Sequence, residues 1–337
     1  MQCKFMTAAL FASIPLVVSA QSDVTVYGIA DAALAVEDSD APNTKRRVAI
    51  NSGNQSSSRI GFRGTEDLGN GLKAMFNIEA GVSLDTGAGD SVLFGRRSVV
   101  GLQGGFGTLT VGREYTPIAA VASMSDIFGQ GFYGSNLSAF TSGRLTRRLS
   151  NSVNYKSAAM NGFKLGAAYG LGETTSGPSH DTMGVALEYA AGALTLGAGY
   201  HVIERLATDD DKEVALGAAY KLGAVEFKAN YLLADQAGAN NEFEQFNLGA
   251  AMTVGTGKVF ANLQQNRLEH GAKGNAFALA YSYPLSKRTN LYTSYAILRN
   301  NSTGVFGLNS SSTNVTPPAA APGADPSAFT IGMRHAF

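Results

Sequence analysis

The residues best suited to chemistry are basic and acidic side chains, most of which sit in short stretches that alternate apolar and polar residues. They are Arg59, Arg63, Lys73, Arg96, Arg97, Arg148, Glu79, Glu114 and Asp126. A guanidinium group stays charged at all physiological pH values and is planar, so several can stack when they are crowded together. Set opposite carboxylates in a narrow space, such groups create an electric field that orients polar solutes. Their chemistry is electrostatic, and it depends on the elements that bring them together.

The same sequence contains few signals of enzymatic or metal-dependent chemistry. The histidines His180, His201, His270 and His335 are dispersed and lack the spacing of metal ligands. A nucleophile elbow of the type Gly-x-Ser-x-Gly is absent from the chain. The three aspartates at 209–211 could bind a divalent cation at the tip of a loop, although such runs are more often simply solvated. We expect no enzyme activity and no cofactor.

The composition of the 337-residue chain excludes several classes of protein. Lys and Arg together number 26, as do Asp and Glu, so the net charge is zero, whereas proteins that bind nucleic acids carry a basic excess. Charged residues make up 15% of the chain, against about 25% in soluble domains. The hydrophobic share is 45% and the mean hydropathy is −0.01, which does not suit a bundle of membrane-spanning helices. We expect no nucleic-acid partner.

Residues 1–20 have the pattern of a cleaved secretory signal peptide. A basic residue near the start precedes an apolar stretch, and positions 18–20 form the small-x-small triplet that signal peptidase reads. The apolar stretch is shorter than the ~20 residues of a membrane-spanning helix, and a buried N-terminal helix is the alternative. We expect an exported chain with a single domain of residues 21–337. It would lack disulfides, because the only cysteine is Cys3.

From residue 21 onward the chain alternates apolar and polar residues with period two, which is the pattern of β-strands. In residues 72–80 the even-numbered positions are all apolar, while Lys73, Asn77 and Glu79 lie on the opposite face. The same pattern occurs at 24–31, 225–233, 258–266, 291–296 and 329–337. No window sustains an amphipathic helical stripe for more than about three turns. The sequence therefore predicts an all-β domain.

Short glycine-rich turns alternate with long polar connections along the chain. Counting the segments between them predicts sixteen strands of ~10 residues each. A closed antiparallel barrel pairs every backbone polar group in lipid and leaves no sheet edge. The pattern favours a 16-stranded antiparallel transmembrane β-barrel. A soluble sandwich or propeller is the alternative, but a propeller needs a blade-length repeat that is missing, and a sandwich would leave edges to protect.

The final segment of the chain supports the barrel. Phe329, Ile331, Met333, His335 and Phe337 share one face of the last predicted strand. No chain follows that could cover this row in a soluble fold. In a barrel the row faces lipid, and the terminal aromatic ring lies at the membrane interface.

Alternation sorts the charged residues between the two faces of the wall. Arg59 and Arg63 oppose Ile60 and Phe62, so they point into the lumen, and Lys73 does so by the same argument. The inward carboxylates expected on nearby strands are Asp31, Glu79 and Glu114.

The alternation does not decide which of two neighbouring arginines points into the lumen. Arg96 and Arg97 cannot both point inward on a regular strand. Parity from Val100 favours Arg97, whereas a bulge near Gly95 would select Arg96. Arg148 shares parity with polar residues of its own strand, so we expect it to face water.

The connection from about residue 115 to 147 is too long for a turn and rich in apolar residues. A loop with that content must pack on other parts of the protein. Asp126, with Glu114 at the base of the loop, is its main acidic feature, and Arg144 and Arg147 stand at its return. An ordinary external loop that packs on its neighbours is the alternative.

Taken together, these motifs resemble the general porins of Gram-negative bacteria, specifically the β-proteobacterial type. The resemblance rests on residues 24–31, 58–74, 100–113, 148–153, 285–289 and 332–337, and it extends over the whole chain after the signal peptide. The family pattern favours Arg96 over Arg97 as the inward residue. The chain differs from the family in having Glu114 where Gln is usual. It also has a long Ser/Thr/Ala/Pro segment near 309–327, which we expect to affect only a surface loop.

The resemblance implies a homotrimer of 16-stranded barrels in the outer membrane, with short periplasmic turns, long extracellular loops and a third loop folded into the pore. It implies a water-filled channel for the passive passage of small hydrophilic solutes and ions. Because arginines outnumber carboxylates among the inward residues, we expect weak anion selectivity through an arginine-rich constriction. Lipopolysaccharide is an expected partner, bridged through Ca²⁺ or Mg²⁺ to the aspartates at 209–211.

Three alternatives stay open on the sequence alone. The channel could be specific for one solute, which would need an aromatic track along the lumen. The chain could be an outer-membrane hydrolase, which would need fewer strands and a clustered catalytic site. Finally, the inward charges could form compensating pairs that give the pore no ion selectivity.

Overall fold

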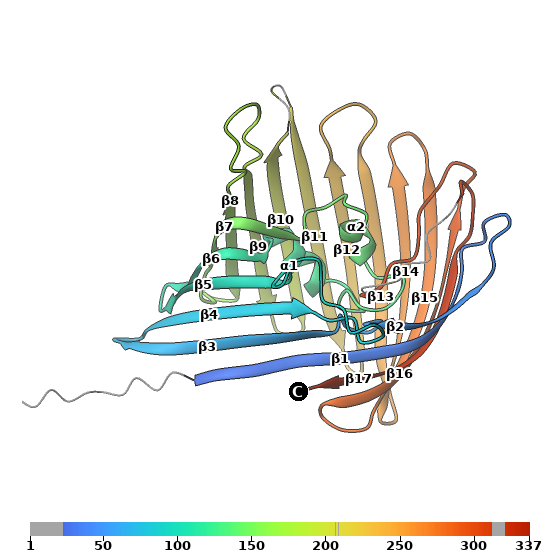
Figure 1. Ribbon diagram of the computed structural model, residues 1–337, viewed down its shortest axis with the longest axis horizontal. Coiled ribbons are helices and arrows are strands. Elements are labelled where there is room, and N and C mark those ends of the chain that lie inside the picture. Colours follow the sequence, from blue (N-terminus) through green and yellow to red (C-terminus); the bar gives the residue numbers. More distant parts are fainter. Residues whose placement is uncertain (1–22, 206, 208, 312–320) are drawn as a thin grey trace, which may run out of the picture.

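The structure is a computed structural model, and it describes residues 23–205, 207, 209–311 and 321–337. Antiparallel strands form a barrel whose interior holds two short helices (Figure 1). The predicted signal peptide at 1–20, with Cys3, lies outside the described residues.

The barrel is built from strands rich in β-branched, aromatic and small residues, which suit a pleated wall. The strands are β1 Asp23–Asp38, β2 Arg47–Ser52, β3 Arg59–Gly69, β4 Leu72–Gly81, β5 Arg97–Gly104, β6 Gly107–Tyr115, β7 Arg148–Lys156, β8 Phe163–Gly170, β9 Thr182–Ala191, β10 Leu194–Glu204, β11 Asp210–Leu222, β12 Val225–Asp235, β13 Phe243–Val254, β14 Gly257–Leu268, β15 Lys273–Pro284, β16 Thr289–Asn300 and β17 Ser327–Ala336. The helices are α1 Pro117–Met124 and α2 Leu137–Thr141. The predicted all-β fold is confirmed.

Strand β1 closes the barrel, because it pairs with segments from both ends of the chain. On one side it pairs with β17, from Ile29 opposite Ala336 to Asp38 opposite Ser327. On the other side its first half pairs with β3 and its second half with β2. Segments β2 and β3 are therefore two parts of one wall strand, interrupted at residues 53–58. The wall has sixteen strands, as the alternation predicted.

Side chains alternate between the interior and the outer surface along each strand. On β14 the amides of Asn262 and Gln264 are buried toward the interior, while Leu263 between them is 54% exposed on the outside. The outward row of β17 is also exposed, including Phe329 and the terminal Phe337. The outer wall is thus apolar and the inner wall polar, which is the arrangement of a barrel in lipid.

Connections differ between the two mouths of the barrel. Short turns join the strands at one mouth, such as Gly69-Asn70-Gly71 between β3 and β4, where all three residues have positive φ angles. Glycine and asparagine adopt this conformation with least strain. The longest connections lie at the other mouth, and the two longest are the third loop, residues 116–147, and the eighth loop, residues 301–326.

The third loop folds into the barrel, as the resemblance implied, and is not an ordinary external loop. It carries α1 and α2, which lie inside the ring of strands in Figure 1. Ile118, Val121 and Leu137 are at most 1% exposed, and α1 packs against β9, β10 and β11. Within the described parts of the chain, no helix is long and apolar enough to cross a membrane.

Candidate functional site

Helix α1 of the third loop lies on a part of the inner wall where glycines replace larger residues. A Cβ atom at Gly217 would stand 2.5 Å from the Ser125 hydroxyl, and one at Gly199 would stand 3.1 Å from the Ile118 side chain. Any side chain at these positions would push the helix away from the wall. The glycines of β10 and β11 therefore fix how deeply the loop enters the barrel.

Amide side chains of the wall hold the backbone of the third loop. The donors are Asn230, Asn262 and Gln264, which bond to the carbonyl oxygens of Ser125, Gly134 and Ser135 at 2.9, 2.8 and 2.8 Å. Buried carbonyl groups that have no sheet partner need such donors. These amides were not predicted from the sequence, although Asn262, Gln264 and Asn266 recur at period two on the inward face of one strand.

The start of the eighth loop also enters the barrel, so the expectation that the segment near 309–327 affects only a surface loop is wrong. Ser311 N–H donates to the Gly131 carbonyl at 2.9 Å, and its hydroxyl donates to the Gly53 carbonyl at 2.6 Å. Leu308 is 1% exposed. Small polar side chains join this segment to other loops without any periodic signal in the sequence. Residues 312–320 of the segment lie outside the described part of the chain.

Asp126 lies inside the third loop and does not face the lumen. Its carboxylate is buried and accepts the N–H groups of Phe128, Gln130 and Asn136 at 3.0–3.1 Å. Burial raises the pKa of Asp126 to about 6, against the opposing effect of these hydrogen bonds. Asp126 therefore stabilises the turn of the third loop, and its carboxylate is not exposed to the pore. Parity could not have shown this, because alternation does not apply to an irregular loop.

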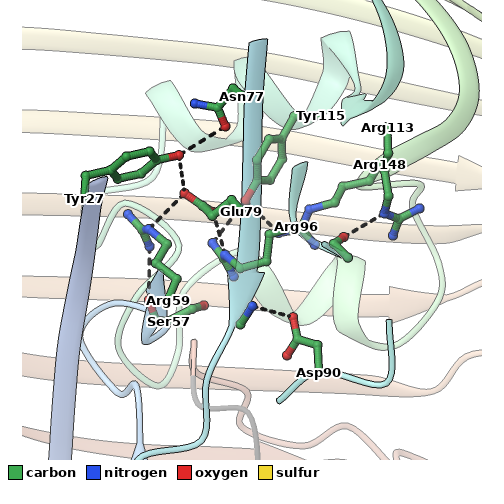
Figure 2. A network of polar contacts seen from close by, with 12 residues as sticks. Tyr27, Ser57, Arg59, Asn77, Glu79, Asp90, Arg96, Arg113, Tyr115 and Arg148 are labelled. Atoms are coloured by element: carbon green, nitrogen blue, oxygen red, sulfur yellow. Dashed lines mark hydrogen bonds and ion pairs between the residues drawn. The ribbon is translucent and has the colours of Figure 1, made fainter. Parts of the chain in front are cut away.

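Glu79 on β4 is the centre of one group of side chains on the inner wall. Arg96 Nε lies 2.6 Å from one of its carboxylate oxygens, and Arg59 Nε lies 3.3 Å from the other. The Tyr27 hydroxyl donates to Glu79 at 3.1 Å (Figure 2). The structure thus brings Arg59, Arg96 and Glu79 together, although they are separated by up to 37 positions in the sequence.

Tyr115 is the centre of a second group, which was not predicted from the sequence. Its hydroxyl accepts hydrogen bonds from Arg148 Nη2 at 2.6 Å and Arg96 Nη2 at 3.2 Å. The Cζ atoms of Arg148 and Arg147 lie 4.3 and 5.7 Å from the centre of its ring, within the range of cation–π attraction. Figure 2 shows Tyr115 between Arg96 and Arg148. Burial lowers the pKa of Arg147 to about 10, so this residue keeps its charge at neutral pH.

Arg97 binds the second inward carboxylate. Its Nη2 donates to Glu114 on β6, and Lys156 Nζ lies 3.6 Å from the same oxygen. Arg97 stands opposite Glu79 in strand register, so parity places it inside. Arg96 precedes β5, where alternation does not apply, and its side chain also turns inward. Both arginines therefore reach inward carboxylates, which neither reading of the sequence anticipated.

The groups around Glu79 and Tyr115 border a cavity of about 370 Å³ between the wall and the third loop. Its lining includes Arg59, Arg96, Arg147, Glu79, Tyr115, Gln130 and Ser311. We call Arg59, Arg96, Arg97, Arg147 and Arg148 the arginine cluster. Its five guanidinium groups face the two carboxylates of Glu79 and Glu114, so positive charge is in excess by three. Within the described residues, four members of the cluster, Arg59, Arg97, Arg147 and Arg148, have a buried Nε atom that makes no hydrogen bond.

Other predicted site residues lie apart from the cluster. Lys73 is exposed near the turn at 69–71, and it stands six positions before Glu79 on β4, about 20 Å away. Arg63 is exposed, with its Cζ 5.0 Å from the centre of the Tyr27 ring, beside the cluster. Arg144 donates to Gln236 at 3.4 Å.

Two predicted acidic sites serve the structure of the loops. Asp31 is fully buried and accepts the N–H groups of Gln55 and Ser56 at 3.1 and 2.7 Å, which fixes the interruption between β2 and β3. Of the aspartates at 209–211, Asp211 binds Arg205 at 2.8 Å. No group of three or more potential metal ligands occurs in the part of the chain that the structure describes.

The sequence is similar to those of known porins, which agrees with the barrel geometry described above. The family model described as Gram-negative porin matches residues 7–303. Outer membrane porin protein 32 of Delftia acidovorans is 33% identical, over 94% of this chain and 95% of its own. An outer membrane porin protein of Bordetella pertussis is 28% identical, over 90% and 87% of the two chains.

Solved structures show the same fold. The anion-selective porin from Comamonas acidovorans is similar with a TM-score of 0.85 and 27% identity, over 94% of this chain and 100% of that one. An outer membrane protein of Vibrio cholerae, described as a trimer form, gives a TM-score of 0.70 at 17% identity, over 94% and 99% of the two chains.

Proposed function

The chain belongs to the family of Gram-negative porins, and from this premise we propose that its arginine cluster makes it an anion-preferring channel. It is a protein of the outer membrane, and it forms a channel for the passive diffusion of small hydrophilic solutes and ions. The outer-membrane hydrolase considered from the sequence is thereby rejected. What remains to be established is the ion preference and the residues that set it.

The excess of guanidinium groups over carboxylates in the narrow part of the barrel carries the proposal. Arg59, Arg96 and Arg97 bind carboxylates, Arg148 binds Tyr115 and Arg147 binds Gln130, so the positive charges cannot move apart into bulk water. A fixed positive field in a narrow pore favours anions and penalises cations. The Comamonas relative is described as anion-selective, which supports the same direction.

The constriction that we propose comprises the arginine cluster with Glu79, Glu114 and Tyr115. Arg63 stands beside it, whereas Lys73 and Asp126 contribute little to its field because of their positions. The partly exposed guanidinium groups of Arg59 and Arg97 are suited to replace part of the hydration shell of a passing anion.

We further propose that the chain assembles as a homotrimer after removal of residues 1–20. The Vibrio cholerae relative described as a trimer form and the apolar outer wall support this assembly. Channel formation is its only proposed activity, since the matched relatives are porins and not enzymes. Lipopolysaccharide around the barrel and the small solutes inside it are its proposed partners.

Swelling of liposomes that contain the purified protein tests the proposal. In isotonic solutions of several unrelated sugars of one size, swelling rates should be similar, because the pore does not recognise a particular sugar. A small organic anion should enter faster than a cation of the same size. Strong preference for one sugar would instead favour the solute-specific channel, and equal rates for the two ions would contradict the role of the arginine cluster.

A further inference from the structure

His201 and Glu213 form a buried pair on the inner wall. They stand opposite each other on β10 and β11, with His201 Nδ1 3.3 Å from Glu213 Oε2, and their side chains are 0% and 4% exposed. On its other side, His201 is paired with Gly184 of β9. A Cβ atom at Gly184 would stand 2.4 Å from the imidazole ring. Glycine at this position makes room for the ring.

The histidine contacts the start of the third loop. Ile118 N–H donates to His201 Nε2 at 3.4 Å. N–H groups in the first turn of a helix have no partner within the helix. In α1, Pro117 has no N–H and the Thr116 hydroxyl accepts the N–H of Ala119, so His201 supplies the acceptor for Ile118.

The carboxylate contacts the return of the same loop. Glu213 Oε1 accepts the N–H and the hydroxyl of Thr146 at 2.9 and 2.8 Å. The Thr116 hydroxyl donates to the Thr146 carbonyl at 2.8 Å, which joins the two ends of the loop. One pair of wall residues therefore holds both ends of the loop, and Arg147 of the arginine cluster follows directly after Thr146.

The contact with Ile118 requires that His201 Nε2 be unprotonated. In that tautomer the proton sits on Nδ1, which lies 3.3 Å from the carboxylate of Glu213 on β11 without the alignment of a hydrogen bond. Gly184 on β9 carries no charge, and α1 presents only its backbone N–H. A second proton on Nε2 would oppose the Ile118 N–H and would place a positive charge at the positive end of α1.

We propose that His201 and Glu213 are positioning residues that hold the third loop at neutral pH and loosen their hold when His201 takes up a second proton. The inference rests on the proposed channel function, because the loop forms one wall of the constriction. Loosening the start of the loop, which the hydrogen bond between Thr116 and Thr146 joins to its return, changes the width of the pore and moves Arg147. Acid pH is therefore expected to alter conductance through this pair.

Single-channel recording of the folded protein at pH 7.5 and pH 5 tests the proposal. In wild type, acidification should raise the time spent at altered conductance levels by on the order of tenfold, as expected when a buried hydrogen bond is lost. His201→Gln offers an acceptor for Ile118 and has no ionisable group, so it should stay at the neutral conductance at both pH values. His335→Gln, on the exposed end of β17, is the matched control and should respond as wild type does.

Deuterium uptake by a peptide covering residues 117–124 gives a readout independent of conductance. After correction for the intrinsic pH dependence of exchange, it should rise on the order of tenfold at pH 5 in wild type and not in His201→Gln. An acid response in His201→Gln equal to that of wild type, or no response in wild type, overturns the inference. Absence of conductance steps at pH 7.5 would instead contradict the channel function, and the exchange data would still decide on the loop.

Discussion

Tyr115 fixes the spacing of the arginine cluster through both its hydroxyl and its ring. Two guanidinium groups share the hydroxyl as an acceptor, and two lie over the ring or beside it. Like charges about 4 Å apart repel each other by about 1 kcal/mol even in water. A carboxylate in the same place would hold the arginines but cancel one of their charges. A neutral phenol holds them together and leaves the positive field intact.

Replacing Tyr115 by Phe removes the shared acceptor and no charge. A hydrogen bond to a charged group is worth about 1.5 to 3 kcal/mol, so Arg96 and Arg148 should become mobile. We expect a noisier open-channel current and an altered single-channel conductance, while the sign of the ion preference stays the same. Tyr295→Phe on the outer surface is the control. If the recordings of Tyr115→Phe and Tyr295→Phe were indistinguishable, they would contradict the role of Tyr115.

Replacing Arg59 and Arg148 by Ala removes two charges of the cluster. A unit charge about 4 Å from the path of an ion changes the energy of that ion by about 1 kcal/mol in water, or about fivefold in its local concentration. The anion-to-cation permeability ratio should therefore fall several-fold. Lys73→Ala, far from the cluster, should leave the ratio within error of wild type. Equal effects of the Lys73 and Arg variants would show that selectivity is set elsewhere.

Asp126 makes the stability of the folded protein depend on pH. Its pKa is raised by burial to about 6, against about 3.9 in an unfolded chain, so the folded state binds the proton more tightly. This stabilisation is fully present below about pH 4 and is lost as the pH rises through about 6, with an upper limit of about 3 kcal/mol. Asp126→Asn should remove this dependence from thermal unfolding measured between pH 4 and 7. An unchanged dependence in the variant would contradict the assignment.

At the scale of elements, the wall surface beneath the third loop determines the position of that loop. Helix α1 rests on wall positions that lack side chains, and amides of β12 and β14 bind the backbone of the loop. Both features belong to strands that are distant in sequence from the loop. The width of the pore is therefore determined as much by the wall as by the loop.

Gly217→Ala tests how the wall supports the loop. The new Cβ would stand 2.5 Å from Ser125 Oγ, so α1 must move. We expect a changed single-channel conductance with an intact barrel, as judged by far-ultraviolet circular dichroism. Gly166→Ala is the matched control, since its nearest neighbour would be 3.9 Å away, an ordinary contact. Equal conductance in the two variants would show that the loop does not depend on Gly217.

Elements of the wall were predictable from sequence, whereas the contacts of the loops were not. Period-two alternation follows directly from strand geometry, so residues 72–80 revealed both their strand and the inward position of Glu79. The inward turn of Arg96, the burial of Asp126 and the docking of Ser311 occur where the backbone is irregular. From the sequence, His201 was considered only as a possible metal ligand, because no sequence pattern connects it to Ile118, 83 positions earlier.

At the scale of the whole molecule, closure by β1 makes the barrel a sealed wall with an apolar outside and a polar inside. Two loops and the interruption at residues 53–58 then narrow the interior beside the arginine cluster. We therefore expect passing solutes to cross the positive field. The membrane position follows from the outer surface, and the ion preference that we propose follows from the inner one.

The zero-current potential of the protein in a planar bilayer under a KCl gradient tests most directly whether the arginine cluster sets the ion preference. If it does, discrete channel steps should appear and the dilute side should become negative, because chloride crosses faster than potassium. A positive dilute side, with channel steps present, would leave the porin fold intact but contradict the arginine cluster as the determinant of selectivity, and would make Glu79 and Glu114 the dominant charges.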